Sequence, residues 1–210
     1  DLERLDELNL ANNGIESLEG IENAFSIRDL NLEGNRIKDI TPLEDLMYLE
    51  HLSLRDNRIE DASVISDLKR LTTLDLRNTG LEDLQPVTEL VDLTQLNVRG
   101  NSIKSLEPLQ DLTQLQVLNV RNNQIDDIST LSQLTQLEDV NLRNNRIEDF
   151  TPILELPHLN KRLYVEGNPG LNLRDFIEMY ERVEEMDIDS PDLAVVFSES
   201  GGVFQDSQLI

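Results

Sequence analysis

Residues 49–59 read LEHLSLRDNRI, in which Leu49, Leu52, Leu54, Asn57 and Ile59 define the pattern Leu-x-x-Leu-x-Leu-x-x-Asn-x-Ile. The pattern returns every 22 residues, so the chain is one unit repeated along its length. A unit this short cannot bury its apolar face alone, and we therefore predict that the units stack into a solenoid. The second leucine position is filled by Leu8, Leu30, Leu52, Leu74, Leu96, Leu118, Val140 and Leu163, the last after one residue inserted around 160–162.

The repeat also fixes a polar position at the turn after each predicted strand. An asparagine side chain there hydrogen-bonds backbone groups of its own coil and of the neighbouring coil, which a buried, sharply bent backbone requires. Thr79 takes this position in the fourth repeat and supplies only part of these bonds, so we predict that the fourth turn is the weakest. Ala24 and Ala62 replace larger apolar residues and predict looser packing. The turn column reads Asn13, Asn35, Asn57, Thr79, Asn101, Asn123, Asn145 and Asn168.

Composition limits the function before any site is considered. The 210 residues are 38% hydrophobic and 29% charged, which suffices for a buried core. The 18 Lys and Arg against 42 Asp and Glu give a net charge of −24, which disfavours nucleic acid and anionic membranes as partners. The sequence has no cysteine and no apolar run long enough to span a membrane. It opens on Asp1 within a repeat, and we expect it to be a piece of a longer protein.

Three segments follow from the periodicity. Residues 1–171 hold about eight repeats, 172–190 form a predicted helical cap, and 191–210 are interpreted as a strand on the cap or the start of a following domain. Asn172 is a good N-cap, and the residues after it follow helical spacing to about Met186. Prolines in the arms that return to the strands predict turns or short 3₁₀ segments. The apolar helix positions are Leu173, Phe176, Ile177, Tyr180 and Val183, and the prolines lie in Thr41-Pro42, Gln85-Pro86, Glu107-Pro108 and Thr151-Pro152.

The repeats resemble those of the bacterial internalins, a class of leucine-rich repeat proteins, in stretches such as DITPL at 39–43 and DISTLSQLTQL at 127–137. The resemblance covers residues 1–171. It implies an α/β leucine-rich repeat solenoid in the shape of an arc, with a parallel β-sheet on the concave face and turns and short 3₁₀ segments on the convex side. It also implies a cell-surface or secreted bacterial protein that binds other proteins. Many internalins carry an immunoglobulin-like domain after the repeats, and residues 195–204 resemble the start of one.

Other interpretations stay open. No helical cap of the internalin type precedes the repeats, and a helix after them is more typical of other leucine-rich repeat proteins. The nuclear and cytosolic phosphatase-regulatory subfamily shares the 22-residue period, so a cytosolic scaffold or regulatory subunit is one alternative. A recognition or spacer arm of a larger surface or spore-coat protein is another. The predicted location is extracellular or at the cell surface, with the cytoplasm as the alternative.

The sharpest feature of the sequence is a column of arginines on the predicted concave face. Strand leucines point inward, so the residues beside them project outward, and equivalent residues of successive coils lie ~4.8 Å apart. One hypothesis is that the arginines are solvated or paired with nearby acids, for which Glu33, Asp75, Asp139 and Glu166 are candidates. The other is that they bind carboxylates, sulfates or phosphates of a partner, because the guanidinium fork pairs bidentately. The column is Arg55, Arg77, Arg99, Arg121 and Arg143.

The neighbouring columns favour recognition over chemistry. Asparagines at positions such as Asn97 and Asn119 predict a structural ladder of amides that bond to one another. Tyr164 and Arg162 have the amphipathic character of interface anchors, or pack under the cap. The predicted partner-binding residues are His51, Arg55, Asp75, Arg77, Arg99, Arg121, Arg143 and Tyr164.

Catalysis and metal binding are disfavoured. Asp29, His51 and Ser53 could meet as a triad, but the sequence shows no nucleophile elbow and no evident oxyanion hole. A column of aspartates beside the strands could share Ca²⁺, yet it lacks a dense Gly-Asp motif, and we interpret it as a solvated acidic flank. The prediction is a non-catalytic, monomeric protein-interaction module with no cofactor and no metal, whose protein partner has an acidic surface. No nucleic acid and no membrane insertion are predicted for this piece. The aspartates are Asp39, Asp61, Asp83, Asp127 and Asp149.

Overall fold

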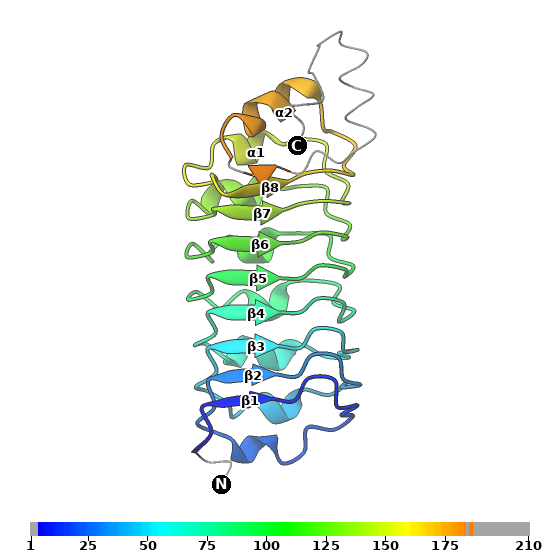
Figure 1. Cartoon of the computed structure of the whole chain (residues 1–210), viewed down its shortest axis with the longest axis vertical. Helices are drawn as coiled ribbons and strands as arrows, with labels where there is room; N and C mark the ends of the chain where they lie inside the picture. Colours follow the sequence, from blue (N-terminus) through cyan, green and yellow to red (C-terminus); the bar gives the residue numbers. More distant parts are fainter. Residues whose placement is uncertain (1–3, 184, 187–210) are drawn as a thin grey trace.

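The computed structural model describes residues 4–183, 185 and 186, and over these residues the chain winds as a stack of coils (Figure 1). Each coil contributes one short strand to a parallel sheet whose order follows the sequence. The strands lie on one side of the stack and short helical segments lie behind them (Figure 1). We number each coil after its strand. The strands are β1 (Glu7–Asn9), β2 (Asp29–Asn31), β3 (His51–Ser53), β4 (Thr73–Asp75), β5 (Gln95–Asn97), β6 (Val117–Asn119), β7 (Asp139–Asn141), β8 (Arg162–Tyr164) and β9 (Glu185–Met186).

The strand register reproduces the 22-residue repeat, which confirms the predicted solenoid. Leu30 of β2 pairs with Leu8 on one side and Leu52 on the other. Val140 still pairs with Leu163, so the extra residue before β8 is absorbed outside the strand. The segments on the opposite side are 3₁₀ helices η2 (Ile21–Asn23), η3 (Thr41–Leu43), η4 (Ser63–Asp67), η5 (Gln85–Val87), η6 (Glu107–Leu109) and η7 (Ser129–Gln133), followed by the short α-helix α1 (Thr151–Leu154). The prolines start η3, η5, η6 and α1, as predicted.

Alternation within each strand separates the core from the exposed face. In coil 3, Leu52 and Leu54 are buried, whereas His51 is exposed and Ser53 is half-buried. The inward residues join into one core, mostly of leucine, isoleucine and valine, that extends from Leu18 to Met179. Each fully buried leucine contributes about 1.5–3 kcal/mol relative to an exposed one. The stack is therefore held together by contacts between neighbouring coils.

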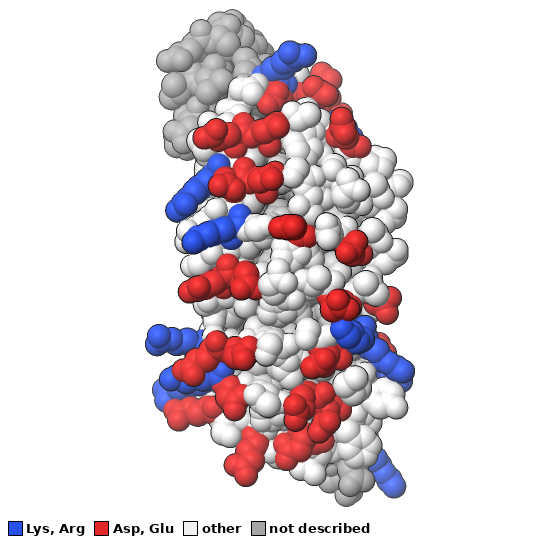
Figure 2. All heavy atoms as spheres, turned by 180° about the vertical axis from the view of Figure 1, so that it is seen from behind, with Lys and Arg blue, Asp and Glu red and all other residues white. Residues whose placement is uncertain are grey.

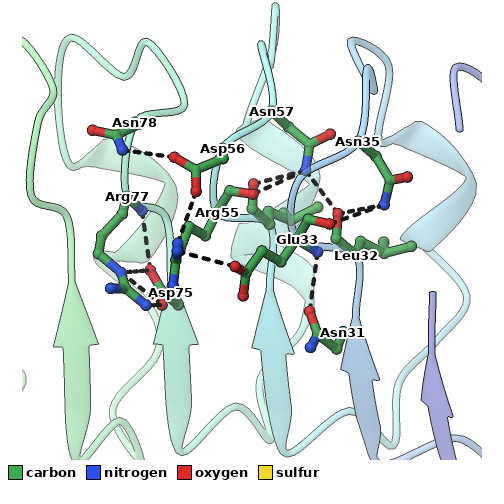
Figure 3. Close-up of polar contacts among 11 residues, drawn as sticks. Asn31, Leu32, Glu33, Asn35, Arg55, Asp56, Asn57, Asp75, Arg77 and Asn78 are labelled. Atoms are coloured by element: carbon green, nitrogen blue, oxygen red, sulfur yellow. Dashed lines mark hydrogen bonds and ion pairs between the residues drawn. The ribbon is translucent and has the colours of Figure 1, made fainter. Parts of the chain in front are cut away.

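The asparagine column ties each coil to the one before it, as predicted. The Asn35 amide nitrogen donates to Leu32 O in its own coil (2.8 Å) and to Leu10 O in the preceding coil (2.9 Å). Its Oδ1 accepts the backbone N–H of Ile15 (3.0 Å). The Asn57 amide makes the same two bonds one coil further on, and Figure 3 shows Asn35 and Asn57 side by side above their strands. One asparagine side chain thus satisfies three backbone groups at such a junction.

Thr79 makes fewer of these bonds. Its hydroxyl lies 2.8 Å from Leu76 O in its own coil. Within the described residues the side chain makes no bond to the preceding coil, where an asparagine amide would reach Leu54 O and Ile59 N. The Ile59 N–H donates instead to the Thr79 carbonyl (3.1 Å). The junction between coils 3 and 4 therefore has a weaker link than its neighbours.

The helix after the repeats starts as predicted but presents a different face. Helix α2 (Leu173–Tyr180) is capped by Asn172, whose side chain accepts the Asp175 N–H (3.1 Å). Met179 is the buried residue, whereas Ile177 and Tyr180, two of the apolar residues that define the predicted helical spacing, are 38% and 44% exposed. Adjacent helical residues are separated by about 100° of rotation. Met179 and Tyr180 therefore point in different directions, and Met179 takes the position that faces the core.

The end of the described chain adds a strand to the sheet. The helix ends at Tyr180 and not near Met186, and β9 pairs with β8, with Leu163 opposite Met186. The Arg182 guanidinium donates to the carbonyls of Leu154 and Leu156, which are the last residue of α1 and a residue just after it. Val183, predicted as a helix position, lies beyond the end of α2 and is half-buried against the core. The side chains of Leu173 and Phe176 and the predicted tail, 191–210, lie outside what the structure describes.

Candidate functional site

The exposed face of the sheet, called the sheet face below, carries the predicted site. A hollow of about 340 Å³ crosses it from β4 to β8. Val117 lies at its centre between polar neighbours, because it pairs with Gln95 on β5 and with Asp139 on β7. The side chains that line the hollow outside the core are Thr73, Asp75, Gln95, Asn97, Val117, Asn119, Asp139, Asn141, Arg162 and Tyr164.

The five arginines follow the ends of successive strands, as predicted, and the two at the N-terminal end of the row are neutralised. Arg55 Nη2 lies 3.0 Å from Glu33 Oε1, and its Nε lies 2.8 Å from Asp56 Oδ2. Arg77 Nε donates to both oxygens of Asp75 (2.9 Å each). Figure 3 shows Arg55 turned toward Glu33 of the preceding coil, and Arg77 turned toward Asp75 of its own coil. The Arg77 and Asp75 side chains are 27% and 19% exposed, so water screens this pair only in part.

The titration behaviour of this end of the row follows from the same contacts. Hydrogen bonds to Asp75 raise the pKa of the Arg77 guanidinium. The Asn78 amide donates to Asp56 Oδ1 (2.6 Å) and, with smaller effects from Arg55 and Arg77, lowers the pKa of Asp56. The Arg77 guanidinium and the Asp56 carboxylate are therefore charged at neutral pH.

The last arginine of the row is also held by neighbours. Its guanidinium carbon lies 4.7 Å from the centre of the Tyr164 ring, which is a cation–π geometry. Arg143 Nε lies 3.5 Å from Glu166 Oε2, and the Arg143 side chain is only 14% exposed. The predicted interface residue Tyr164 is therefore also a platform for Arg143. Of the four candidate partners, Glu33, Asp75 and Glu166 pair with the row, whereas Asp139 accepts from Arg162 Nε (2.8 Å) on the neighbouring strand.

The two arginines in the middle of the row differ from the other three. Arg99 and Arg121 have no carboxylate partner among the residues that the structure describes, and both side chains are half-buried. Arg121 Nε is buried and makes no hydrogen bond within this part of the chain. Two guanidinium groups one coil apart repel by about 1–3 kcal/mol, depending on the effective dielectric. Partly buried charge without a counter-ion is thus concentrated at the centre of the row.

Asparagines beside the row fix its backbone, although not in the predicted way. Asn97 Oδ1 accepts the Arg99 N–H (3.3 Å), and Asn119 Oδ1 accepts the Arg121 N–H (3.1 Å). The central column thus bonds within each coil and not from amide to amide. A direct amide contact occurs in another column, where Asn144 Nδ2 donates to Asn122 Oδ1 (2.7 Å). Both residues have positive φ, and recurring Asn, Asp and Gly after each arginine position is the sequence signal for this column.

The three residues of the possible catalytic triad, Asp29, His51 and Ser53, lie outside the hollow. His51 is exposed on β3, outside the hollow. It pairs in register with Asp29, but within residues 4–183 no hydrogen bond joins His51 to Asp29 or to Ser53. The triad geometry considered from the sequence is therefore not assembled there.

The acidic column of the flank has a structural role. Asp39 Oδ1 accepts the Thr41 N–H (2.9 Å), and Asp61 Oδ1 accepts the Ser63 N–H (2.8 Å), so each carboxylate caps the start of a 3₁₀ segment. Hydrogen bonds from Thr41 lower the pKa of Asp39, and those from Ser63 lower the pKa of Asp61. In the part of the chain described, no group of three or more His, Asp and Glu is placed to hold a metal ion. Asp83, Asp127 and Asp149 cap Gln85, Ser129 and Thr151 in the same way.

Residues 4–183, 185 and 186 include no helix that could cross a membrane, since the longest, α2, has 8 residues. The parallel register, the asparagine turns and the opposing 3₁₀ segments define a leucine-rich repeat protein. A family model for leucine-rich repeats (2 copies) matches residues 49–89 and 91–133.

Comparison with solved structures narrows the class. The chain superimposes on internalin C2 of Listeria monocytogenes with a TM-score of 0.79 and 30% identity, covering 88% of this chain and 81% of that one. Internalin InlF of the same organism gives a TM-score of 0.72 and 28% identity over 89% of this chain and 61% of InlF. A Leptospira interrogans leucine-rich repeat protein, at 22% identity and a TM-score of 0.61, covering 86% of this chain and 60% of that one, shares the fold. No curated protein sequence matches. The chain belongs to the internalin-like leucine-rich repeat proteins.

Proposed function

We propose that the chain binds a protein partner through the sheet face, and that Arg99 and Arg121 receive carboxylates of that partner. The observation that carries the proposal is the pair of half-buried guanidinium groups without counter-ions at the centre of the row. A partner carboxylate that pairs with the exposed part of the two guanidinium groups would offset their mutual repulsion. The similarity to internalins supports a protein-interaction module without catalysis or cofactor.

The surroundings of the pair indicate the kind of partner. Because the protein carries a net charge of −24, a uniformly acidic partner is repelled at long range. We infer that the partner presents one or two carboxylates among polar and apolar residues. An apolar side chain of the partner packs over Val117 in the hollow. Arg55, Arg77 and Arg143 already bind acids of this chain and are secondary contacts. His51 and Tyr164 flank the pair and contribute contact area.

The proposed setting is a bacterial cell surface or the extracellular medium, with the module acting as a monomer. It rests on the similarity to internalin C2 and InlF. A cytosolic scaffold or regulatory subunit is the alternative, and the compartment of the captured partner distinguishes the two.

The test is capture of partners from extracellular and cytosolic extracts, with affinities then measured for each captured protein. The variant Arg99→Gln/Arg121→Gln is compared with Lys104→Gln/Arg146→Gln, which makes the same change of charge at exposed residues. Loss of charge-assisted bonds worth about 2 kcal/mol or more predicts at least ~30-fold weaker binding for the first variant only. Equal affinity of both variants, at melting temperatures equal to that of the wild type, would contradict the proposal.

A further inference from the structure

A second surface lies on the flank between coils 3 and 4, apart from the sheet face. It is a groove of about 670 Å³. Its apolar wall is formed by Ile59, Ala62, Leu81 and Pro86. The lining also includes four carboxylates and one guanidinium, that of Arg58, together with uncharged polar residues such as Ser63 and Gln85.

The groove coincides with a break in the backbone hydrogen bonds of the flank. At six of the seven junctions between neighbouring coils 1 to 8, a backbone N–H just after one asparagine-column turn donates to a carbonyl of the preceding coil. Arg58 N to Ile37 O (3.2 Å) and Ser102 N to Leu81 O (2.9 Å) are the examples on either side. The equivalent bond from Gly80 N to Ile59 O is missing, since Gly80 N donates to Asn101 Oδ1 (3.0 Å). Within the described residues the Ile59 carbonyl accepts no hydrogen bond.

Two small departures from the repeat cause the break. Thr79 has no amide to hold Ile59 N, so this N–H turns to the Thr79 carbonyl and the Ile59 carbonyl is left without a donor. Ile59 is half-buried, whereas its equivalents Ile37 and Ile103 are fully buried. Ala62 stands where coils 2 and 4 have Ile40 and Leu84, and the missing side-chain volume deepens the groove. Of the two alanines for which looser packing was predicted, Ala62 lines the groove and Ala24 is fully buried.

The charges of the groove favour a cation. Asp61 and Asp83 each use one oxygen to cap a 3₁₀ segment, and Glu60 lies 3.1 Å from Lys38 in an exposed ion pair. The Glu82 carboxylate has no ion-pair partner in the described part of the chain. Figure 2 shows further acidic side chains spread over the face opposite the sheet, with basic side chains mainly toward its edges.

We propose that this groove binds an extended, lysine- or arginine-bearing segment of a partner protein. A backbone N–H of the segment donates to the free Ile59 carbonyl, as in strand addition. An apolar side chain fills the space over Ala62, and a flanking cationic side chain pairs with Glu82. The proposal does not depend on the sheet face, because none of the groove residues belongs to the arginine row.

The experiment uses a hexapeptide of alternating lysine and valine as the probe and follows the amide resonances of the isotope-labelled chain. Binding is expected to shift the amides of Ile59, Gly80 and Leu81 most strongly. Thr79→Asn restores the bond between the coils and Ala62→Leu fills the groove, and neither changes the charge. Each is expected to weaken binding at least about tenfold, whereas Thr113→Asn, at an exposed position elsewhere, leaves the affinity unchanged.

The design separates specific binding from attraction to a polyanion. Shifts spread evenly over the acidic residues, equal affinity of all four proteins, or no binding to the wild type would each overturn the proposal. Equal binding of a hexapeptide with glutamate in place of lysine would overturn it as well. The melting temperature of each variant shows that it is folded, and Ala62→Leu tests the groove even if Thr79→Asn alters the turn.

Discussion

At the scale of single residues, the turn column shows how much one side chain contributes to the stack. The Asn123 amide donates to Val98 O (3.0 Å) and Val120 O (2.9 Å), and its Oδ1 accepts the Ile103 N–H (3.0 Å). Asn97, by contrast, accepts one bond on the half-buried sheet face. The two positions hold the same type of residue, yet three backbone groups bond to the Asn123 side chain and one to that of Asn97.

We predict that Asn123→Ala lowers the free energy of unfolding by at least about 2 kcal/mol, because buried backbone groups are left unsatisfied. Asn97→Ala is expected to cost less than about 1 kcal/mol. Thr79→Asn should raise the free energy of unfolding by about 1–2 kcal/mol through two new bonds between coils. Urea denaturation of the three variants checks these values, and a larger loss for Asn97→Ala than for Asn123→Ala would show that the turn column is not the main link.

The capping aspartates predict a dependence on pH. Hydrogen bonds lower the pKa of Asp39 in the folded protein below its usual 3.8. A lowered folded pKa means that the charged form stabilises the fold above pH ~4, and that this contribution is lost as the pH falls through the folded pKa. Melting temperatures of the wild type and of Asp39→Asn should therefore differ by a constant amount above about pH 5, and the advantage of the wild type should shrink toward pH 2. If the melting-temperature advantage of the wild type over Asp39→Asn grew as the pH falls, the lowered pKa assigned to Asp39 would be contradicted.

At the scale of elements, strands and 3₁₀ segments could be predicted from the sequence because every inward position is repeated eight times. The face of α2 could not, because Met179 and Tyr180 are adjacent apolar residues and one short helix offers no repeat to average over. The repeat places Asp139 opposite Arg162, but the spacing alone could not show that Asp139 binds Arg162 and not the arginine row, since this choice depends on side-chain direction. Geometry within a strand was predictable, and choices between neighbouring side chains were not.

We predict that Leu96→Ala in β5 lowers the free energy of unfolding by about 2–5 kcal/mol, because Leu96 is 1% exposed and its removal leaves a cavity between coils. Val91→Ala is the control, since Val91 is 52% exposed and should change stability by less than about 0.5 kcal/mol. Chemical denaturation of both variants provides the comparison. A loss well under 1 kcal/mol for Leu96→Ala would mean that the inward assignment of the strand leucines is mistaken.

At the scale of the whole molecule, the arginine row is a small cationic strip on a protein of net charge −24. Its position could be predicted from the repeat. Part of its division could be predicted too, since the candidate partners Glu33, Asp75 and Glu166 each lie against an arginine of the row. That Asp56 also binds Arg55 depends on side-chain geometry that no spacing rule contains. The ends of the row stabilise the fold through ion pairs and the Tyr164 ring, and its centre holds charge that the described fold does not neutralise. The proposed function rests on this division.

The most direct test of the division is the free energy of unfolding of five single variants, Arg→Gln at residues 55, 77, 99, 121 and 143, measured without a partner. Removal of Arg77 or Arg143 should cost about 1 kcal/mol, because each loses a partly buried ion pair or ring contact, and removal of Arg55 about 0.5 kcal/mol. Removal of Arg99 or Arg121 should be neutral within about 0.5 kcal/mol or slightly stabilising, since repulsion and an unsatisfied donor are relieved. Equal losses along the row, or the largest losses at Arg99 and Arg121, would contradict the account.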